Sequence, residues 1–318
     1  MSVYAFIFPG QGSQYVGMGR DLAASFASAR EVFDEVDDAL SFRLSRLMFN
    51  GPMEELTLSA NAQPALMAVS MAVMRVLVVE GGIDPKRIVT AYAGHSLGEY
   101  SALIAAQCLD IATAARLLRL RGEAMQKACE KRESGMAALL GVDLAQAQDI
   151  CQEAQESEPA GSVVEIANDN GGGQVVISGD LDAVKNAVEK AKARGVRRAL
   201  LLPVSGAFHS SLMAPAAKIV EEALRKVHFH TPVLPVVMNV VADYVRDASK
   251  ISHLLVKQVT GTVRWRESME FMLEHNIDSF VEIGAGKVLS GLVKRIAPDA
   301  DSYTVGTPEE VEAILKIF

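Results

Sequence analysis

The sequence predicts an α/β fold built from a large parallel-sheet core and a smaller α+β subdomain inserted into it. Short apolar strands alternate with helical patterns in the first and last parts of the chain, which is typical of a parallel sheet. Between them the expected order of elements changes to β-α-β-β-α-β. The length of 318 residues also exceeds what one small core requires, so a second unit is expected.

The first part of the chain supplies two strands of the predicted core. Residues 3–8 are a short apolar run that ends in Pro-Gly, which indicates a buried strand followed by a loop. Residues 88–93 predict a second strand, which turns at once into a helix. Helical patterns occupy 20–48, 62–80 and 110–131.

The inserted subdomain is expected over residues 132–204. Its predicted elements follow the ferredoxin-like order: strand 136–140, helix 144–156, strands 163–167 and 174–178, helix 181–194 and strand 198–203. The turn-rich segment NDNGGG joins the two central strands. The large domain then comprises residues 1–131 and 205–318. In its last part, strands are expected near 235–239, 279–283 and 302–305, and helices near 263–275, 287–296 and 308–317.

Composition limits the classes of function. The formal net charge of −8 argues against a general nucleic-acid binder, which needs a broad basic surface. The N-terminus lacks the basic segment of a secretion signal, and the apolar stretch 65–79 contains Ser70 and Arg75, so it predicts a core helix and not a membrane span. The three cysteines fit no zinc-binding spacing and indicate reduced thiols in a cytoplasmic protein.

The strongest local signal is GHSLG at 94–98, a G-x-S-x-G motif between a predicted strand and a predicted helix. A serine on such a turn is presented at a helix N-terminus, where main-chain N–H groups face developing negative charge. Ser96 is therefore the candidate nucleophile, and the N–H of Leu97 is the natural donor to an oxyanion. The alternative is a chance turn with an N-capping serine.

A serine nucleophile needs a base, and the chain has six histidines. His209 follows a predicted strand within LPVSGAFHSSLM, in the kind of loop where catalytic residues collect. His95 adjoins Ser96 and is expected to line the wall of the site or to be structural. The other four fit surface, strand-edge or helical-face positions, so His209 is the leading candidate for the base.

Several motifs together resemble the malonyl-CoA:acyl-carrier-protein transacylases of fatty-acid synthesis. They follow that family's order along nearly the whole chain: FPGQGSQ at 8–14, GHSLGEYSAL at 94–103, RGEAMQ at 121–126, NDNGGGQVVISG at 168–179, LPVSGAFHSSLM at 202–213, VRW at 263–265 and EIGAGKVLSGL at 282–292. The resemblance implies an α/β hydrolase-like parallel-sheet core with an inserted ferredoxin-like α+β subdomain. Two loops depart from the family: NDNGGG has Gly where Ser-Pro is common, and Ala285 replaces a common Pro.

The resemblance also implies catalytic roles. Ser96 would be the nucleophile and His209 the general base, with the main-chain carbonyl of Gln258 orienting the imidazole. The N–H groups of Gln11 and Leu97 would form the oxyanion hole. A malonyl-serine ester would then pass its acyl group to the phosphopantetheine thiol of acyl carrier protein.

The resemblance implies five substrate-binding residues as well. Arg121 would bind the malonyl carboxylate in a two-bond fork. Met125 lies one helical turn further on and could line the acyl pocket or pack in the core. Phe208 would crowd an α-methyl branch. His95 and Asn168 would complete the wall of the site; for Asn168, as for its neighbour in the motif, a plain turn role is equally compatible.

The expected partners are malonyl-CoA and an acyl carrier protein, without nucleic acid, membrane, metal or redox cofactor, and the expected state is a monomer. Carrier proteins of this pathway are acidic, so an acidic enzyme needs a local basic patch. Residues 185–198 offer one, although a solvated helix face has the same composition: Lys185, Lys190, Lys192, Arg194, Arg197 and Arg198.

Three other functions remain open at this stage. A serine esterase or thioesterase could use the same motif, but it predicts a late histidine, and the late His275 lies in a predicted helix. A separate acyltransferase that serves a polyketide synthase shares every motif. A non-catalytic binding module would have the Ser96, His209 and Arg121 set only by coincidence.

Overall fold

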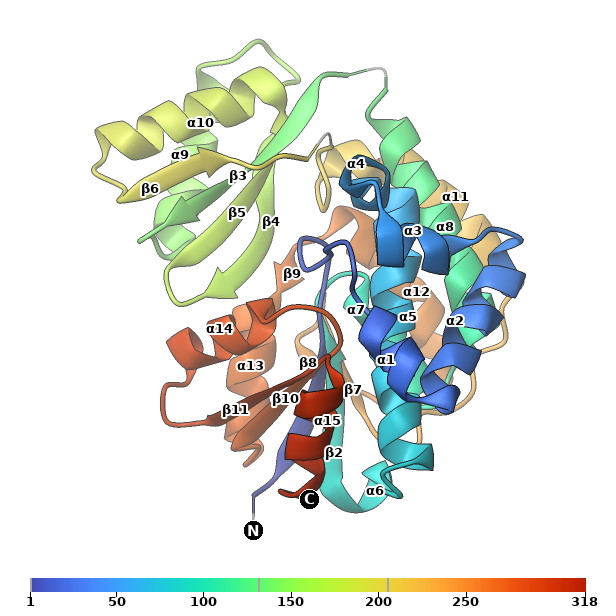
Figure 1. Cartoon of the computed structure of the whole chain (residues 1–318). Helices are drawn as coiled ribbons and strands as arrows, with labels where there is room; N and C mark the ends of the chain where they lie inside the picture. The colour runs from blue at the N-terminus through green and yellow to red at the C-terminus, as the bar shows by residue number, and fades with distance from the viewer. Residues whose placement is uncertain (1, 131, 205) are drawn as a thin grey trace.

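The structure is a computed structural model that describes residues 2–130, 132–204 and 206–318. Its centre is a six-stranded sheet in the order β11-β10-β1-β2-β7-β8, shown in Figure 1. All neighbouring strands are parallel except β8, which runs antiparallel to β7. The strands are β1 (Tyr4–Phe8), β2 (Val89–Gly94), β7 (Val236–Met238), β8 (Asp243–Val245), β10 (Ser279–Ile283) and β11 (Asp301–Val305).

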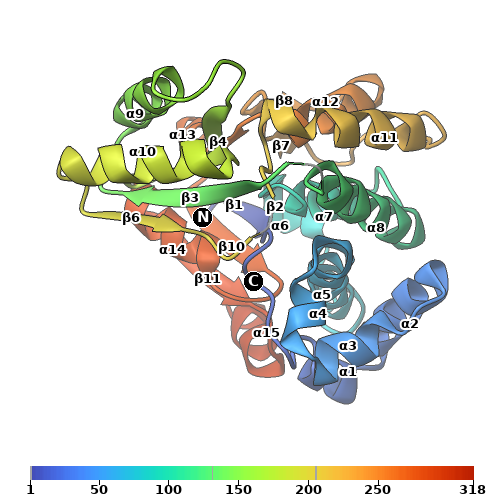
Figure 2. The ribbon, with the colours of Figure 1, turned by 90° about the horizontal axis from the view of Figure 1, so that it is seen from above.

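Helices cover both faces of this sheet, as Figure 2 shows from above. One side packs α2 (Ala27–Leu40), α5 (Ser59–Val79), α7 (Gly98–Ala105) and α8 (Ile111–Ala128) into the main core. On the other side, α13 (Trp265–Glu274) and α14 (Val288–Ile296) bury a second cluster against β1, β2 and β10. The other helices outside the subdomain are α1 (Arg20–Ser25), α3 (Leu44–Asn50), α4 (Met53–Thr57), α6 (Pro85–Ile88), α11 (Ala214–Leu224), α12 (Ala248–Thr260), α15 (Pro308–Leu315) and the short 3₁₀ helix η1 (Ser211–Met213).

α5 is long and apolar enough to cross a membrane by length and composition alone. However, 83% of its most apolar 18-residue window is buried inside the molecule. It packs against α2 and α8 in the main core. The prediction of a core helix at 65–79 is therefore confirmed.

The second sheet has the strand order β6-β3-β5-β4-β9, where β9 is the two-residue strand Val263–Arg264. Pairing from β6 to β4 is antiparallel, and α9 and α10 cover one face. This is the ferredoxin-like arrangement predicted from the order of elements. The elements are β3 (Ser134–Leu140), α9 (Leu144–Glu156), β4 (Val164–Gly171), β5 (Gln174–Asp180), α10 (Leu181–Ala193) and β6 (Arg198–Leu201). The exact subdomain limits, 132–204, stay a prediction, since the adjoining Lys131 and Ser205 lie outside the described residues.

Two local expectations were wrong. The segment NDNGGG is not all turn, because Asn168 to Gly171 belong to β4 and only the glycines that follow make the turn to β5. The predicted helix at 263–275 begins only at Trp265. Residues Val263–Arg264 instead form β9, which pairs in parallel with β4 at Asn168 and Asp169.

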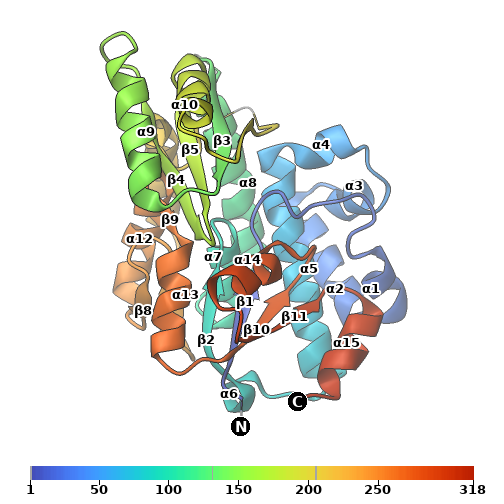
Figure 3. The same ribbon diagram turned by 90° about the vertical axis from the view of Figure 1, so that its left-hand side faces the viewer.

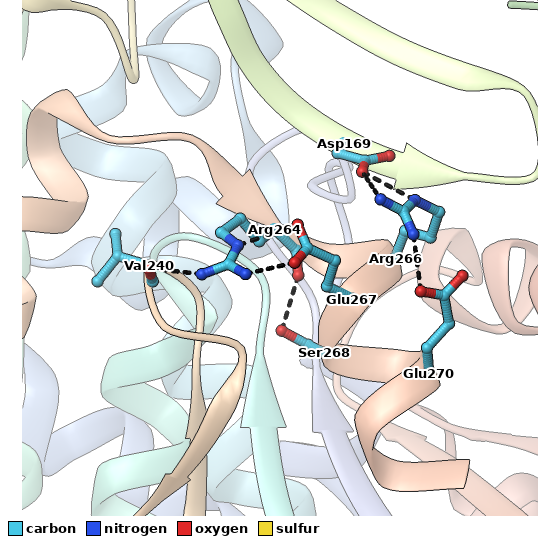
Figure 4. A network of polar contacts seen from close by, with 7 residues as sticks. All are labelled: Asp169, Val240, Arg264, Arg266, Glu267, Ser268 and Glu270. Atoms are coloured by element: carbon cyan, nitrogen blue, oxygen red, sulfur yellow. Dashed lines mark hydrogen bonds and ion pairs between the residues drawn. The ribbon is translucent and has the colours of Figure 1, made fainter. Parts of the chain in front are cut away.

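Strand β9 and its neighbours join the subdomain to the core. In Figures 1 and 3 the subdomain lies beyond the carboxyl ends of β1 and β2, where both strands run into loops. Figure 4 shows how Arg266 of α13 pairs with the buried Asp169 of β4 at 2.9 Å and with Glu270 at 2.7 Å. Thr262 also donates a hydrogen bond to the carbonyl of Ile166 at 2.7 Å. These contacts hold the subdomain over the carboxyl ends of the core strands, where Ser96 follows β2.

Candidate active site

Ser96 lies on the sharp turn between β2 and α7, with a positive φ of 53°. Such a backbone conformation is strained for a residue with a side chain and persists only where its surroundings impose it. Two glycines make the turn possible. A Cβ at Gly94 would overlap the main chain of Gly98, and a Cβ at Gly98 would overlap the carbonyl of Phe8. The hydroxyl is thereby held at the start of a buried helix, as the motif predicted.

His209 lies beside Ser96, with its Nε2 atom 2.7 Å from the serine Oγ. Its Nδ1 faces the main-chain carbonyls of Gln258 at 2.8 Å and Gly261 at 3.2 Å. Carbonyls only accept hydrogen bonds, so the proton sits on Nδ1 and Nε2 is free to accept from the hydroxyl. Burial, together with the positive charge of Arg121, lowers the pKa of His209 to about 3. The imidazole is therefore neutral at neutral pH and available as a base.

Arg121 is a fully buried cation that contacts the same serine. Its Nη2 donates to Ser96 Oγ at 3.1 Å and to the side-chain oxygen of Gln258 at 2.9 Å, and its Nη1 donates to Gln63 at 2.6 Å. Its Nε has no acceptor among the described residues. The site therefore holds a positive charge with an unused donor next to the candidate nucleophile.

An acid, Glu99 on the first turn of α7, is linked to Arg121 through the side chain of Gln258. It is buried, and it accepts hydrogen bonds from the main-chain N–H of Asn239 and from the side-chain amide of Gln258. Burial raises the pKa of Glu99 to about 8, while the two N–H donors and the charge of Arg121 act in the opposite direction. The side chain of Gln258 thus lies between the buried acid Glu99 and the buried cation Arg121.

The predicted oxyanion donors are main-chain N–H groups on two loops near Ser96. The N–H of Ser96 itself is taken, because it donates to the side-chain oxygen of Asn239 at 2.9 Å. The N–H groups of Leu97 and Gln11 have no acceptor within the described part of the chain. The loop that carries Gln11 runs close to the serine turn, since a Cβ at Gly10 would lie 2.7 Å from the carbonyl oxygen of His95.

The remaining predicted residues occupy different environments. Met125 is buried one helical turn after Arg121, and its sulfur accepts from Gln63, which also contacts Arg121. Phe208 lines a small cavity of about 110 Å³ together with Gln11. His95 is turned toward the subdomain, where its Nε2 lies 2.9 Å from Asn170 Oδ1 and its ring packs on Trp265.

Asn168 has a buried side-chain oxygen without a partner among the described residues. A larger cleft of about 910 Å³ is lined by His209, by residues of α9 and by Thr260 to Thr262. Within the described residues no group of three or more His, Cys, Asp or Glu side chains could hold a metal ion.

Sequence reasoning missed three members of this network: Gln63, Glu99 and Asn239. Glu99 left a signal, since it is an acid in an otherwise apolar helical segment directly after GHSLG. Asn239 left another, because it follows strand β7 at the edge of the sheet where functional side chains collect. Gln63 left none, since a glutamine within an apolar helix is uninformative by itself.

Comparisons with known proteins agree with this geometry. Residues 5–306 match the family described as the acyl transferase domain. The malonyl CoA-acyl carrier protein transacylase of Bacillus subtilis (strain 168) is 43% identical over 99% of this chain and 97% of its own length. The enzyme of the same name from Escherichia coli (strain K12) is 42% identical, with full coverage of both chains.

Solved structures give the same result. The acyl-carrier-protein S-malonyltransferase of Bartonella henselae is 52% identical and superimposes with a TM-score of 0.95 over 99% of both chains. A malonyl-transacylase in complex with its type II PKS acyl-carrier protein is 40% identical, with a TM-score of 0.94 and full coverage of both chains. This chain is an acyltransferase and belongs to the malonyl CoA-acyl carrier protein transacylase family.

Proposed function

We propose that this enzyme transfers the malonyl group from malonyl-CoA to the phosphopantetheine thiol of an acyl carrier protein, through a malonyl ester on Ser96. The observation that carries the proposal is the contact between the buried Arg121 guanidinium and Ser96 Oγ. It puts a fixed positive charge beside the atom to which the acyl group would become attached. An acyl group with its own carboxylate is the ligand that this charge favours.

The first half-reaction begins with proton transfer from the Ser96 hydroxyl to Nε2 of His209. The serine oxygen attacks the thioester carbonyl, and the C–S bond then breaks. The coenzyme A sulfur leaves with the proton from His209, and the malonyl-serine ester remains. His209 serves as base and then as acid, while the Gln258 carbonyl keeps its Nδ1 protonated.

The negative charge on the carbonyl oxygen during this step needs donors. The free N–H groups of Gln11 and Leu97 fit that role, and one such donor is typically worth about 3 kcal/mol. In the second half-reaction the carrier thiol gives its proton to His209 and attacks the ester, which restores Ser96. Both steps balance with these groups alone, so we expect no metal or redox cofactor besides the coenzyme A thioester.

Selection of the acyl group would depend on Arg121, Met125 and Phe208. The guanidinium would bind the malonyl carboxylate, and its unused Nε supports this role, because a buried donor without an acceptor is costly. Met125 lies one helical turn after the arginine. Phe208 narrows the small cavity next to Gln11 and would exclude a branched acyl chain. Asn168, through its unpartnered oxygen, would accept a hydrogen bond from the coenzyme A or carrier arm. His95 would support the wall through its contact with Asn170.

The carrier would dock on a basic hollow that is lined by residues of the subdomain and by Arg295 of α14. Lys185, Lys192 and Arg194, which belong to the predicted basic stretch, are paired with Asp182, Glu189 and Glu153. Arg197, Arg198 and Arg295 instead line a hollow of about 530 Å³ beside Gly172 and Gly173. We expect an acidic carrier to bind there. The charge reversals Arg198→Glu and Arg295→Glu should raise the KM for the carrier and leave acylation by malonyl-CoA unchanged.

A polyketide carrier is the second candidate acceptor, because the similar transacylase described above was solved with a type II PKS carrier. Comparison of the second half-reaction with carriers from both pathways separates the two. We further propose that the enzyme is a monomer and that it is cytoplasmic; the three free cysteines support the second point.

Intact-protein mass spectrometry after brief incubation with malonyl-CoA tests the proposal. We expect an adduct of one malonyl group on the enzyme, no adduct on Ser96→Ala, and discharge of the adduct by a carrier protein. Steady release of coenzyme A without transfer to any carrier would indicate a thioesterase and contradict the proposal.

A further inference from the structure

Glu99 is a buried acid that the steps above leave unused. It is 0% exposed and lies three residues after Ser96. One side-chain oxygen of Glu99 accepts from the main-chain N–H of Asn239, and the other accepts from the side-chain amide of Gln258 at 2.7 Å. Since donors occupy both oxygens, this position calls for a group that accepts hydrogen bonds at both places.

Gln258 transmits this preference to Arg121. Its side-chain oxygen accepts from Arg121 at 2.9 Å, while its side-chain nitrogen donates to Glu99 and to the carbonyl of Ser96 at 2.8 Å. An amide can occupy this place in two orientations, related by exchange of its oxygen and nitrogen. Only one of them avoids pointing an N–H group at the guanidinium, and Glu99 selects that one, together with the Ser96 carbonyl, by accepting from the amide nitrogen.

Asn239 connects Glu99 to the strained turn. Its side-chain oxygen accepts from the N–H of Ser96 at 2.9 Å, and its side-chain nitrogen donates to the carbonyl of Gly94 at 2.7 Å. The two bonds span the turn on which Ser96 has its positive φ. Glu99 in turn accepts from the main-chain N–H of Asn239. The same acid therefore positions the asparagine whose two hydrogen bonds, here called the clamp, hold the Ser96 turn.

We propose that Glu99 is a positioning residue for acyl transfer: it fixes the Gln258 amide so that its oxygen faces Arg121, and it holds Asn239 on the Ser96 turn. The inference rests on the proposed function, because it assumes that Arg121 receives the malonyl carboxylate. Preference for a carboxylated acyl group then depends on an acid two hydrogen bonds away from the arginine.

The variant Glu99→Gln tests the first half of the proposal. It keeps the size of the side chain but replaces one acceptor by an N–H₂ group. If Gln258 rotates to accept from this group, its own nitrogen turns toward Arg121 and displaces the guanidinium. We expect malonylation of Ser96 to slow by about 10²-fold, as for a misplacement of about 1 Å, and acetylation to slow far less.

The variant Asn239→Ala tests the second half, because it removes the clamp and leaves Arg121 in place. We expect malonylation and acetylation to slow by a similar factor, with their ratio unchanged. Ser101→Ala is the matched control on the same helix, where a buried hydroxyl has no acceptor among the described residues. Its rates should equal those of the parent enzyme.

The experiment measures time courses of Ser96 acylation by malonyl-CoA and by acetyl-CoA, with thermal unfolding alongside, for these variants and for Arg121→Ala. If Arg121→Ala keeps the parent's malonyl-to-acetyl ratio, the proposed function is wrong. If Arg121→Ala loses that ratio but Glu99→Gln retains it, the function stands and the positioning role is refuted. If Glu99→Gln does not fold, Asn239→Ala decides: parental rates overturn the proposal, and an equal loss with both thioesters supports it.

Discussion

Nη2 of Arg121 lies 3.1 Å from Oγ of Ser96, so the buried cation and the candidate nucleophile are in direct contact. The serine oxygen accepts from the guanidinium, which leaves the hydroxyl proton to point toward His209 at 2.7 Å. One arginine can therefore orient the nucleophile before acylation and hold the acyl carboxylate after it. The role of this contact can be tested by changing the shape of the cation while keeping its charge.

Arg121→Lys should lower kcat/KM for malonyl-CoA by about 10- to 100-fold, because an ammonium cannot reproduce a two-bond fork with a carboxylate. The exposed Arg116 of the same helix provides the control, and Arg116→Lys should have no effect. Steady-state rates with malonyl-CoA and acetyl-CoA check the result. A parental value for Arg121→Lys would show that charge alone is sufficient.

The pH dependence of acylation should reflect the low pKa of His209, about 3 in the folded enzyme. Since the imidazole is already neutral above that pH, we expect kcat/KM for malonyl-CoA to stay level between about pH 7 and pH 5. Rates of Ser96 acylation, measured in quenched time courses between pH 4 and 8, check this. A fall centred near pH 6.5 would mean that the histidine titrates as if exposed to water.

The same group should make folding sensitive to acid. Between the folded pKa of about 3 and the ordinary value of 6.5, the unfolded chain binds the proton more readily than the folded one does. The contribution of His209 to stability is therefore present above pH 6.5 and is lost as the pH falls through this window. Denaturant unfolding of the parent enzyme and of His209→Gln at pH 7 and pH 5 checks this. The free energy of unfolding should fall less between the two pH values in the variant than in the parent.

Gly98→Ala should abolish activity and reduce stability, because the added methyl group would overlap the main-chain carbonyl of Phe8, which cannot move aside. Gly291→Ala is the opposite case. It lies within α14 with open space around it, so alanine should stabilise the protein by about 0.5–1 kcal/mol. Thermal unfolding and acylation assays on both variants check this. Activity in Gly98→Ala would contradict the need for close packing at the turn.

Phe208→Ala should widen the small cavity beside Gln11 and admit a methyl branch on the acyl group. We expect the ratio of kcat/KM for methylmalonyl-CoA over malonyl-CoA to rise about tenfold, as for one methyl group in an apolar pocket. Phe229→Ala, which removes a buried ring elsewhere in the core, controls for lost stability and should leave the ratio unchanged. An unchanged ratio in Phe208→Ala would place the acyl group elsewhere.

The sequence predicted the framework well because apolar periodicity and turn residues are local signals. The strands at 279–283 and 302–305 and the helix at 144–156 were found within a residue of their structural limits. β9 was missed, since two residues carry no periodicity and become a strand only through pairing with β4. The local sequence pattern cannot reveal a strand whose hydrogen bonds are all made with a segment far away in the sequence.

In the site, too, the residues with a local sequence signal were predicted, and those defined by distant contacts were not. Ser96 and His209 could be proposed because a strained turn and a loop histidine have recognisable neighbours. The role of Gln258 was expected only for its carbonyl, and the structure adds a side chain that bridges Arg121 and Glu99. Such a bridge joins three helices and becomes visible only after they pack.

The pairing of β9 with β4 has a consequence for how the chain can be divided. The subdomain is one continuous stretch of sequence, but its sheet is completed by two residues of the large domain, Val263 and Arg264. A fragment limited to residues 132–204 would leave the N–H and C=O groups of β4 at Asn168 and Asp169 open to solvent. An open strand edge recruits other chains, so we expect the isolated fragment to self-associate, whereas the intact enzyme covers that edge with its own backbone.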